Sequence, residues 1–178
     1  MKKGTSAAAG LLAVALLSLS FISRAAEGEN VRLYGTLVAE PCVLRPGDEN
    51  IPIDFGKIVD KYLYTNGRTP SQTFQLHLLE CDLTIGKQVS VTFSGDESKV
   101  LPGMINVQPP DRGIVIGLEN GQGSKQLINQ QGDPIVLDKG SNTLEFRTYV
   151  QGLPVSLSGQ GIVRGAFSAT ATFMLFYQ

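Results

Sequence analysis

Apolar and polar residues alternate along most of the chain after residue 30, which is the period-two pattern of β-strands. Helical periodicity is nearly absent, and clusters of Gly, Pro, Asn and Asp separate the alternating segments. The pattern predicts about eight short strands arranged as a β-sandwich or barrel. The predicted strands lie at 31–37, 51–55, 74–78, 89–93, 104–107, 114–118, 144–150 and 167–177.

Two intervening segments carry local signals of their own. Residues 119–123 contain an Asn-Gly pair between alternating segments, which is typical of a β-hairpin turn. Residues 57–72 contain the sequence NGRTP and are predicted to form a surface loop. Within that loop we expect a short helical turn over residues 57–64.

The last predicted strand is the most regular one, and it runs to the end of the chain. We expect no later strand to pair with it, so its apolar face needs a cover from elsewhere. The alternative is an ordinary sandwich strand whose neighbour comes earlier in the sequence. The apolar face consists of Phe167, Ala169, Ala171, Phe173, Leu175 and Tyr177.

The first alternating segment lies before the first cysteine and contains Val31, Leu33, Gly35 and Leu37. A strand ahead of the core can cover the apolar edge of a different molecule, with backbone hydrogen bonds giving affinity and alternate side chains giving register. The alternative is an ordinary first strand that pairs within its own domain.

The N-terminus has the layout of an export signal. Lys2 and Lys3 precede a 13-residue apolar run, Ala7–Leu19, which is short for a membrane span. Small residues follow, so we expect cleavage after Ala25, with Ala26 as the alternative. The competing interpretation of this run is a membrane anchor.

Composition and charge exclude several classes of function. Charged residues make up 17% of the chain, and removing residues 1–25 leaves 12 basic residues against 16 acidic ones. A chain with that balance lacks the basic footprint of a nucleic-acid-binding protein. One histidine and two cysteines cannot form a zinc site without carboxylates. We therefore expect no nucleic acid, metal or cofactor.

The remaining chemical groups do not form a catalytic set. His77 is expected to be a partly buried strand residue, and no Gly-x-Ser-x-Gly sequence accompanies it. The acidic pairs at 48–49 and 96–97 lie in predicted turns, where we expect them to be solvated. We expect no enzymatic activity and no small-molecule substrate.

Export places Cys42 and Cys81 in an oxidising compartment, where they are expected to form a disulfide. The closed loop would span 40 residues, and the chain-entropy model gives such a loop roughly 4 kcal/mol of stabilisation. The alternative, a redox-active pair, lacks the CxxC spacing.

Three sequence features together resemble a known family. Gly165 stands 14th from the C-terminus, ahead of the alternation that ends in the penultimate Tyr177. The two cysteines enclose the sequences IDFGKI at 53–58 and FQLHLLEC at 74–81. The sequence VRLYGTL at 31–37 precedes them. In this order and spacing they resemble the pilin subunits of bacterial chaperone–usher fimbriae, which include type 1 and P pilus subunits.

The resemblance implies an all-β fold: an incomplete immunoglobulin-like β-sandwich that lacks its C-terminal strand and is completed by a donated strand. It divides the chain into a signal peptide (1–25), an N-terminal donor-strand extension (26–41) and a pilin domain (42–178). The implied partners are a periplasmic pilus chaperone, an outer-membrane usher and neighbouring pilin subunits. The protein would pass through the periplasm to the cell surface and become part of a fimbria.

The resemblance also assigns roles to residues. The donor strand would present Val31, Leu33, Gly35 and Leu37, and the carboxylate of the last residue would be bound by basic residues of the chaperone. The strand at the groove edge, which also binds the chaperone, would comprise Gly165, Phe167, Ala169, Ala171, Phe173, Leu175, Tyr177 and Gln178.

The implied function is that of a structural subunit that polymerises by donor-strand complementation and contributes to cell adhesion. Major rod subunits of this family are usually rich in alanine, whereas only four alanines follow residue 26 here. This composition favours a minor or adaptor subunit, and the rod, tip and terminator positions stay open. The alternative is a self-contained immunoglobulin-like binding module or adhesin.

Overall fold

The computed structural model describes residues 34, 37 and 39–178, and the fold concerns residues 39–178. The signal segment and the predicted donor residues Val31, Leu33 and Gly35 lie outside the described residues. Leu37 is described and is fully exposed.

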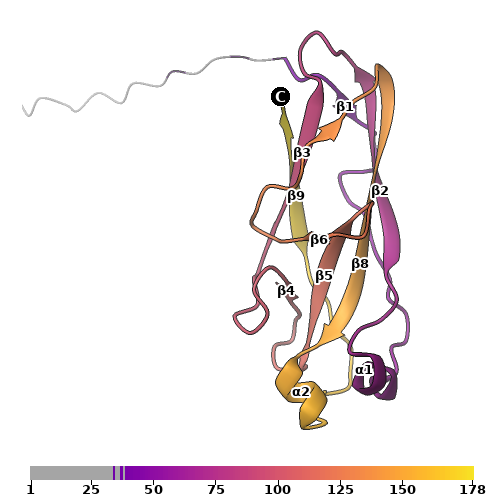
Figure 1. Ribbon diagram of the computed structural model, residues 1–178, viewed down its shortest axis with the longest axis vertical. Coiled ribbons are helices and arrows are strands. Elements are labelled where there is room, and N and C mark those ends of the chain that lie inside the picture. The colour runs from indigo at the N-terminus through magenta and orange to yellow at the C-terminus, as the bar shows by residue number, and fades with distance from the viewer. Residues whose placement is uncertain (1–33, 35–36, 38) are drawn as a thin grey trace, which may run out of the picture. The chain divides into compact units, whose positions relative to one another are not determined.

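Two antiparallel sheets make up residues 39–178, so the all-β prediction is confirmed (Figure 1). The first sheet has the order β1-β2-β8-β5-β4, with β6 paired to β5, and the second has the order β7-β3-β9. In the first sheet the strands are β1 (Val43–Leu44), β2 (Gln72–Cys81), β4 (Ile105–Asn106), β5 (Ile114–Asn120), β6 (Lys125–Gln126) and β8 (Gly140–Gly152). In the second they are β3 (Gln88–Gly95), β7 (Ile135–Val136) and β9 (Ala171–Tyr177).

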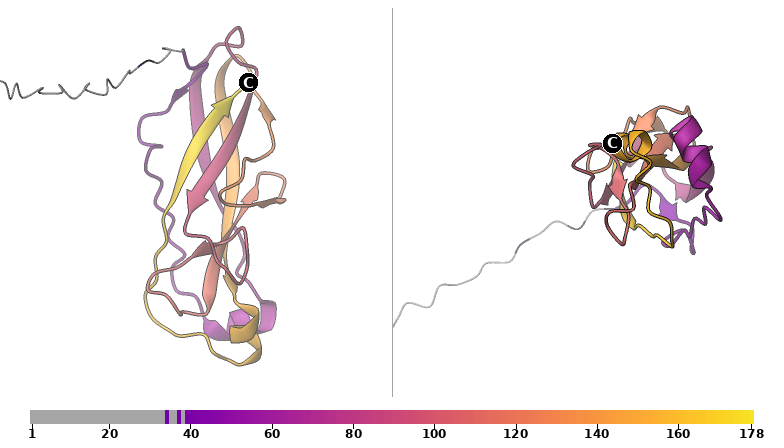
Figure 2. Two further views of the ribbon diagram at one scale, coloured as in Figure 1. Left: turned by 90° about the vertical axis from the view of Figure 1, so that its left-hand side faces the viewer. Right: turned by 90° about the horizontal axis from the view of Figure 1, so that it is seen from below.

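Two short helices lie together at one end of the sheets, and the C-terminus lies at the other (Figures 1 and 2). They are α1 (Asp60–Asn66) and α2 (Pro154–Ser158). The helical turn expected at 57–64 is therefore present, shifted by a few residues. α2 begins with a proline, which suits the first helical position because that residue's N–H has no intrahelical acceptor.

The core lies between the sheets and is centred on three aromatic rings. Phe93 of β3 meets Phe146 of β8 edge-on, with the ring centroids 5.0 Å apart. Phe74 of β2 contacts both rings, at 6.0 and 5.7 Å. Aromatic pairs at these separations contribute about 0.5–1.5 kcal/mol each beyond the burial of their area, so this cluster ties one sheet to the other.

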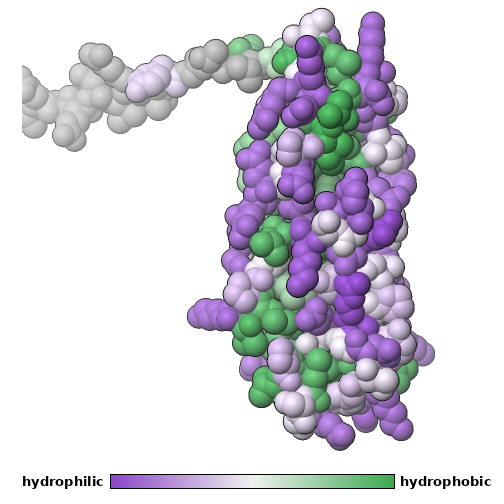
Figure 3. All heavy atoms as spheres, viewed as in Figure 1, coloured by the Kyte–Doolittle hydropathy of each residue, from purple (hydrophilic) through white to green (hydrophobic). Residues whose placement is uncertain are grey.

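Polar residues cover most of the face shown in Figure 3, where apolar side chains form small, separate patches. The alternation behind this appearance is clear in β2, in which Leu76 and Leu78 are buried while Gln75 is exposed. This is the pattern of a strand with one buried face.

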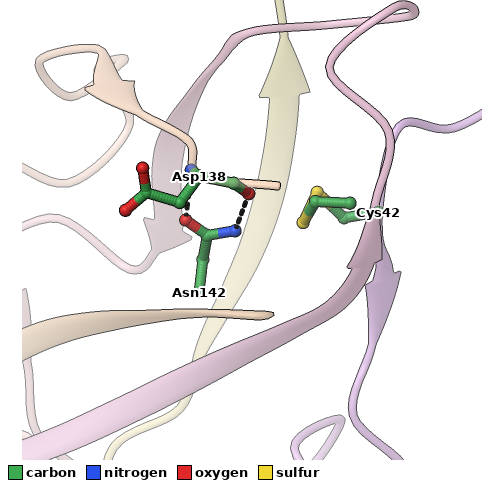
Figure 4. The surroundings of a disulfide bond; sticks show 4 residues. Cys42, Asp138 and Asn142 are labelled. Atoms are coloured by element: carbon green, nitrogen blue, oxygen red, sulfur yellow. Dashed lines mark hydrogen bonds between the residues drawn. A yellow bond between two sulfur atoms is a disulfide. The ribbon is translucent and has the colours of Figure 1, made fainter. Parts of the chain in front are cut away.

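The predicted disulfide between Cys42 and Cys81 is present and joins the start of β1 to the end of β2 (Figure 4). Beside it, the Asn142 side chain accepts a hydrogen bond from the backbone N–H of Asp138 and donates one to its carbonyl, both at 2.8 Å. These contacts fix the chain between β7 and β8 at the same end of the domain as the disulfide.

Five predicted strands are confirmed as β2, β3, β4, β5 and β8. The hairpin turn predicted at 119–123 is present between β5 and β6, at residues 121–124. Two predictions need correction. Residues 51–55 are extended but form no strand, and the last strand becomes regular only at Ala171. Residues 51–55 and 167–170 both show the alternation of side chains. Within residues 39–178, however, neither segment has a continuous strand partner.

Candidate functional site

A groove with a volume of about 810 Å³ lies beside the last strand. It separates two extended segments, which we name the 49–58 wall and the 165–173 wall. Strands of both sheets, β2, β3, β4, β5 and β8, contribute to the floor, so the groove opens directly onto the core. The floor residues are Phe74, Phe93, Ile105, Ile116, Leu118 and Thr148.

The last strand, β9, is an edge strand. It pairs with β3 along one side, and within residues 39–178 no strand pairs with its other side. Gln88 and Gln178 exchange both backbone hydrogen bonds, at 2.9 and 3.0 Å, and Ser168 exchanges both of its bonds with Gln108. In an antiparallel ladder such pairs recur at every second residue. The backbone groups of the odd-numbered residues 167–177 therefore point to the open side.

The side chains of those same odd-numbered residues face the core without being covered. Phe173, Leu175 and Tyr177 are only half-buried, whereas Val89 and Val91 on the neighbouring β3 are almost fully buried. Phe167 and Ala169 continue the half-buried row and also pack against the core, and Ala171 is exposed. The predicted alternation is thus present, but this edge of the core lacks a covering strand within residues 39–178.

The 49–58 wall has the alternation of a strand and none of its pairing. Ile51, Ile53 and Phe55 are half-buried, and the residues between them are exposed. Within residues 39–178, no backbone–backbone hydrogen bond joins this wall to another segment. Its backbone is therefore open to a partner, as is the facing side of β9.

A buried carboxylate holds the start of this wall. Asp48 is 4% exposed and accepts hydrogen bonds from both the backbone N–H and the Nδ1 of His77, at 2.7 and 2.8 Å. Its other oxygen accepts two bonds from Arg45, at 2.7 and 3.1 Å. The expectation that Asp48 is solvated is therefore wrong, because the turn folds its side chain back onto β2.

Burial opposes the charged form of Asp48, but the hydrogen bonds from His77 and Arg45 outweigh it and lower the pKa of the carboxyl to about 2. His77 is half-buried in β2, as predicted. Its partner on the preceding turn was not predicted.

The end of the groove near the helices is shaped by Gly165, whose backbone φ of +132° is one that other residues rarely adopt. A Cβ atom at this position would lie 2.9 Å from Nη1 of Arg112. That nitrogen donates a 2.7 Å hydrogen bond to the carbonyl of Arg164, so the guanidinium occupies the space a side chain would need.

At the other end of β9, one terminal oxygen of Gln178 accepts hydrogen bonds from the backbone N–H groups of Lys87 and Gln88, at 2.7 and 3.0 Å. These bonds hold the last residue of the chain against the start of β3. The strand is therefore fixed up to its final residue, beside the groove.

The structure brings the predicted groove-edge residues 165–178 into one row, and it adds residues that were not predicted as part of the site. The 49–58 wall was assigned to an ordinary strand, although an alternation in the IDFGKI sequence was the available signal. The floor residues fall within predicted strands, and the sequence assigned them no role in a site.

The groove offers apolar surface and backbone groups rather than reactive ones. Among the described residues, no three His, Cys, Asp or Glu side chains are grouped so that they could hold a metal ion. The described helices are all too short or too polar to cross a membrane. This arrangement can bind an extended chain, which would supply backbone hydrogen bonds and alternate apolar side chains.

Comparison with known proteins gives a consistent result. The model of the fimbrial protein family matches residues 31–178. Fimbria A protein of Serratia marcescens is 28% identical over 96% of this chain and 95% of its own length. The fimbrial adapter PapK of Escherichia coli is 31% identical over 92% of this chain and 96% of its own length. A solved chaperone–usher pilus structure has a TM-score of 0.69 and 26% identity, covering 84% of this chain and 94% of that one.

The family match covers most of the chain, and the relatives align over nearly their whole lengths. The chain therefore belongs to the fimbrial protein family: it is a structural subunit of fimbriae at the cell surface, and not an enzyme.

Proposed function

We propose that this fimbrial subunit polymerises by donor-strand complementation, with its groove accepting an extended strand from a neighbouring subunit. The observation that carries the proposal is the open side of β9, where free backbone groups and half-covered apolar side chains belong to the same residues. The fold is then an immunoglobulin-like sandwich that lacks its C-terminal strand, and the incoming strand completes it.

An alternating apolar segment has the right chemistry for this groove. Residues 31–37 of a neighbouring copy would place Val31, Leu33 and Leu37 on the uncovered core edge. Burying these three side chains contributes about 5–9 kcal/mol before ordering costs. Gly35 would allow close approach of the two backbones. We therefore assign residues 1–25 to a signal peptide, 26–41 to the donor extension and 42–178 to the pilin domain.

The empty groove also requires protection before assembly, because an open edge with apolar side chains aggregates. A periplasmic chaperone would supply a temporary strand, and an outer-membrane usher would be the place of exchange. The row Gly165–Gln178 would bind the chaperone, whose basic residues would contact the carboxylate of Gln178.

Within the fibre, we propose a minor or adaptor position that contributes to cell adhesion. The low alanine content after residue 26 supports this position. Neighbouring pilins are then the partners on both sides of the subunit.

The test is expression of the full chain with and without the cognate chaperone. We expect aggregated or degraded protein without the chaperone and a stable 1:1 complex with it. A peptide of residues 27–41 should then replace the chaperone in the complex, whereas the same peptide carrying Gly35→Val should not. A monodisperse, stable monomer made without chaperone that binds no peptide would contradict the proposal and favour a self-contained binding module.

A further inference from the structure

Ile51, Phe55 and Ile58 of the 49–58 wall pack against the core, whereas the side-chain hydrogen bonds that tie this segment to distant parts of the domain lie just beyond its two ends. Asp60 follows this wall as the first residue of α1, and Arg164 immediately precedes the opposite wall. The Arg164 guanidinium donates two hydrogen bonds to Oδ2 of Asp60, from Nη2 at 2.7 Å and Nε at 2.9 Å. This ion pair therefore joins α1, which follows one wall, to the residue that precedes the other wall.

Both partners are themselves anchored. The second oxygen of Asp60 accepts the backbone N–H of Lys61 at 2.9 Å, inside α1. The carbonyl of Arg164 accepts the 2.7 Å bond from Arg112, which lies between β4 and β5. A chain of hydrogen bonds thus runs from Arg112 through Arg164 to α1. The Asp60 side chain is 16% exposed where the guanidinium of Arg164 covers it, and the Arg164 side chain is itself 80% exposed.

Two further contacts lie near the same end of the groove, one beside this ion pair and one between the walls themselves. The Tyr64 hydroxyl of α1 accepts the backbone N–H of Ile162 at 3.1 Å. The rings of Phe55 and Phe167, one from each wall, have centroids 6.3 Å apart. Among the described residues, no aromatic pair and no backbone hydrogen bond joins the 49–58 wall to β9 itself. The half of the groove near the helices is therefore the half in which wall separation is fixed.

We propose that Asp60 and Arg164 are positioning residues, a latch that keeps the walls of the groove at the separation an inserted strand requires. This inference rests on the proposed strand-accepting function. An occupant must pair with β9 while its other side faces a wall that has no backbone partner of its own. With the latch in place, that wall is held before the strand arrives. Less conformational entropy of the wall is therefore lost when the strand binds.

The latch makes a specific prediction for the occupied groove. A labelled peptide of residues 27–41 is loaded into the full chain, and its dissociation is followed in an excess of unlabelled peptide. Asp60→Asn and Arg164→Gln are each expected to speed dissociation by about two- to fivefold, the range for one exposed ion pair. The reversed pair, Asp60→Arg with Arg164→Asp, should bring the rate back toward that of the natural chain.

Arg147→Gln is the matched control, because Arg147 forms an ion pair of the same kind with Glu145 on β8, at 3.0 Å, and neither residue lines the groove. Its dissociation rate should not change. The melting midpoint should move little in all these variants, since the side chain of Arg164 is 80% exposed. Natural dissociation rates in both single variants would overturn the latch.

A second measurement decides the latch without any occupant. In the chain refolded at low concentration, the backbone order parameters of residues 49–58 are expected to fall from about 0.85 towards 0.6 in Asp60→Asn and Arg164→Gln. Unchanged values would overturn the latch. If the natural chain bound no peptide, the proposed function would fail, and these order parameters would still decide whether Asp60 and Arg164 hold the wall.

Discussion

The buried carboxylate of Asp48 stabilises the start of the 49–58 wall. This wall has no backbone hydrogen bonds to other segments within residues 39–178, and the side-chain bonds of Asp48 attach it to β2. One oxygen binds two groups of His77 on β2, and the other binds Arg45. Removing one partner of such a cluster leaves buried polar groups without hydrogen bonds, which costs more than the bonds contribute on balance.

The pKa of Asp48 leads to a pH prediction. The carboxyl has an ordinary pKa of 3.8 and a folded pKa of about 2, so its contribution is fully present above pH 4 and is lost as the pH falls through 2. A shift of this size corresponds to about 2 kcal/mol. Asp48→Asn should lower the free energy of unfolding by about that amount at pH 7 and by much less at pH 2, as measured by denaturant unfolding.

Asp54→Asn on the exposed face of the same wall is the control, and it should leave unfolding at pH 7 nearly unchanged. An equal loss of stability in Asp48→Asn at pH 7 and pH 2 would show that the carboxylate charge is not the cause. The sequence did not reveal this role, because an Asp-Glu pair in a turn is usually solvated. The partners of Asp48 are set by folding: His77 stands 29 residues away.

Among the elements, β9 has two chemically different sides. The even-numbered residues bond to β3, and the backbone groups of the odd-numbered residues face the groove. The amides of Met174 and Phe176 should therefore exchange slowly with solvent in the empty chain, while those of Phe173 and Leu175 exchange fast. Adding the 27–41 peptide should protect the odd-numbered amides, which residue-resolved hydrogen exchange measures directly.

The even-numbered amides serve as an internal control in this experiment, since the β3 ladder protects them with or without peptide. Protection of odd- and even-numbered amides alike in the empty chain would mean that β9 is not an open edge. Peptide binding without protection of the odd-numbered amides would place the peptide elsewhere.

The sequence predicted elements wherever an alternation was several residues long. β2, β3, β5 and β8 were found in this way, whereas the two-residue strands β1, β6 and β7 are too short to show a period. Residues 51–55 show what alternation can and cannot establish. It identified the half-buried face of Ile51, Ile53 and Phe55, but it carries no information on whether a neighbouring backbone is present.

On the scale of the whole molecule, the position of residues 39–41 disfavours a chain that fills its own groove. The carbonyl of Pro41 accepts the Asp82 N–H, and Pro41 and Gln178 both lie against Gly86. Residues 39–41 thus join the rest of the domain at the end where β9 finishes (Figure 1). If residues 31–37 filled their own groove, they would run parallel to β9. A neighbour's strand can instead run antiparallel, which is slightly more stable.

Assembly and chaperone binding should depend differently on Gly35 of the proposed donor strand. Gly35→Val adds a branched side chain where the donor backbone approaches its neighbour, and overpacking of this kind costs about 1–3 kcal/mol, roughly a 5- to 150-fold loss of affinity. Thr36→Val is the matched control, because it adds the same side chain one residue further on, where side chains point to the opposite face of the strand. Gly35→Val should reduce fibres counted by electron microscopy about tenfold or more. It should leave the 1:1 chaperone complex intact, because the proposed chaperone site is the groove and does not include residue 35. Normal fibres in Gly35→Val, or equal losses in both variants, would show that the proposed donor register is wrong.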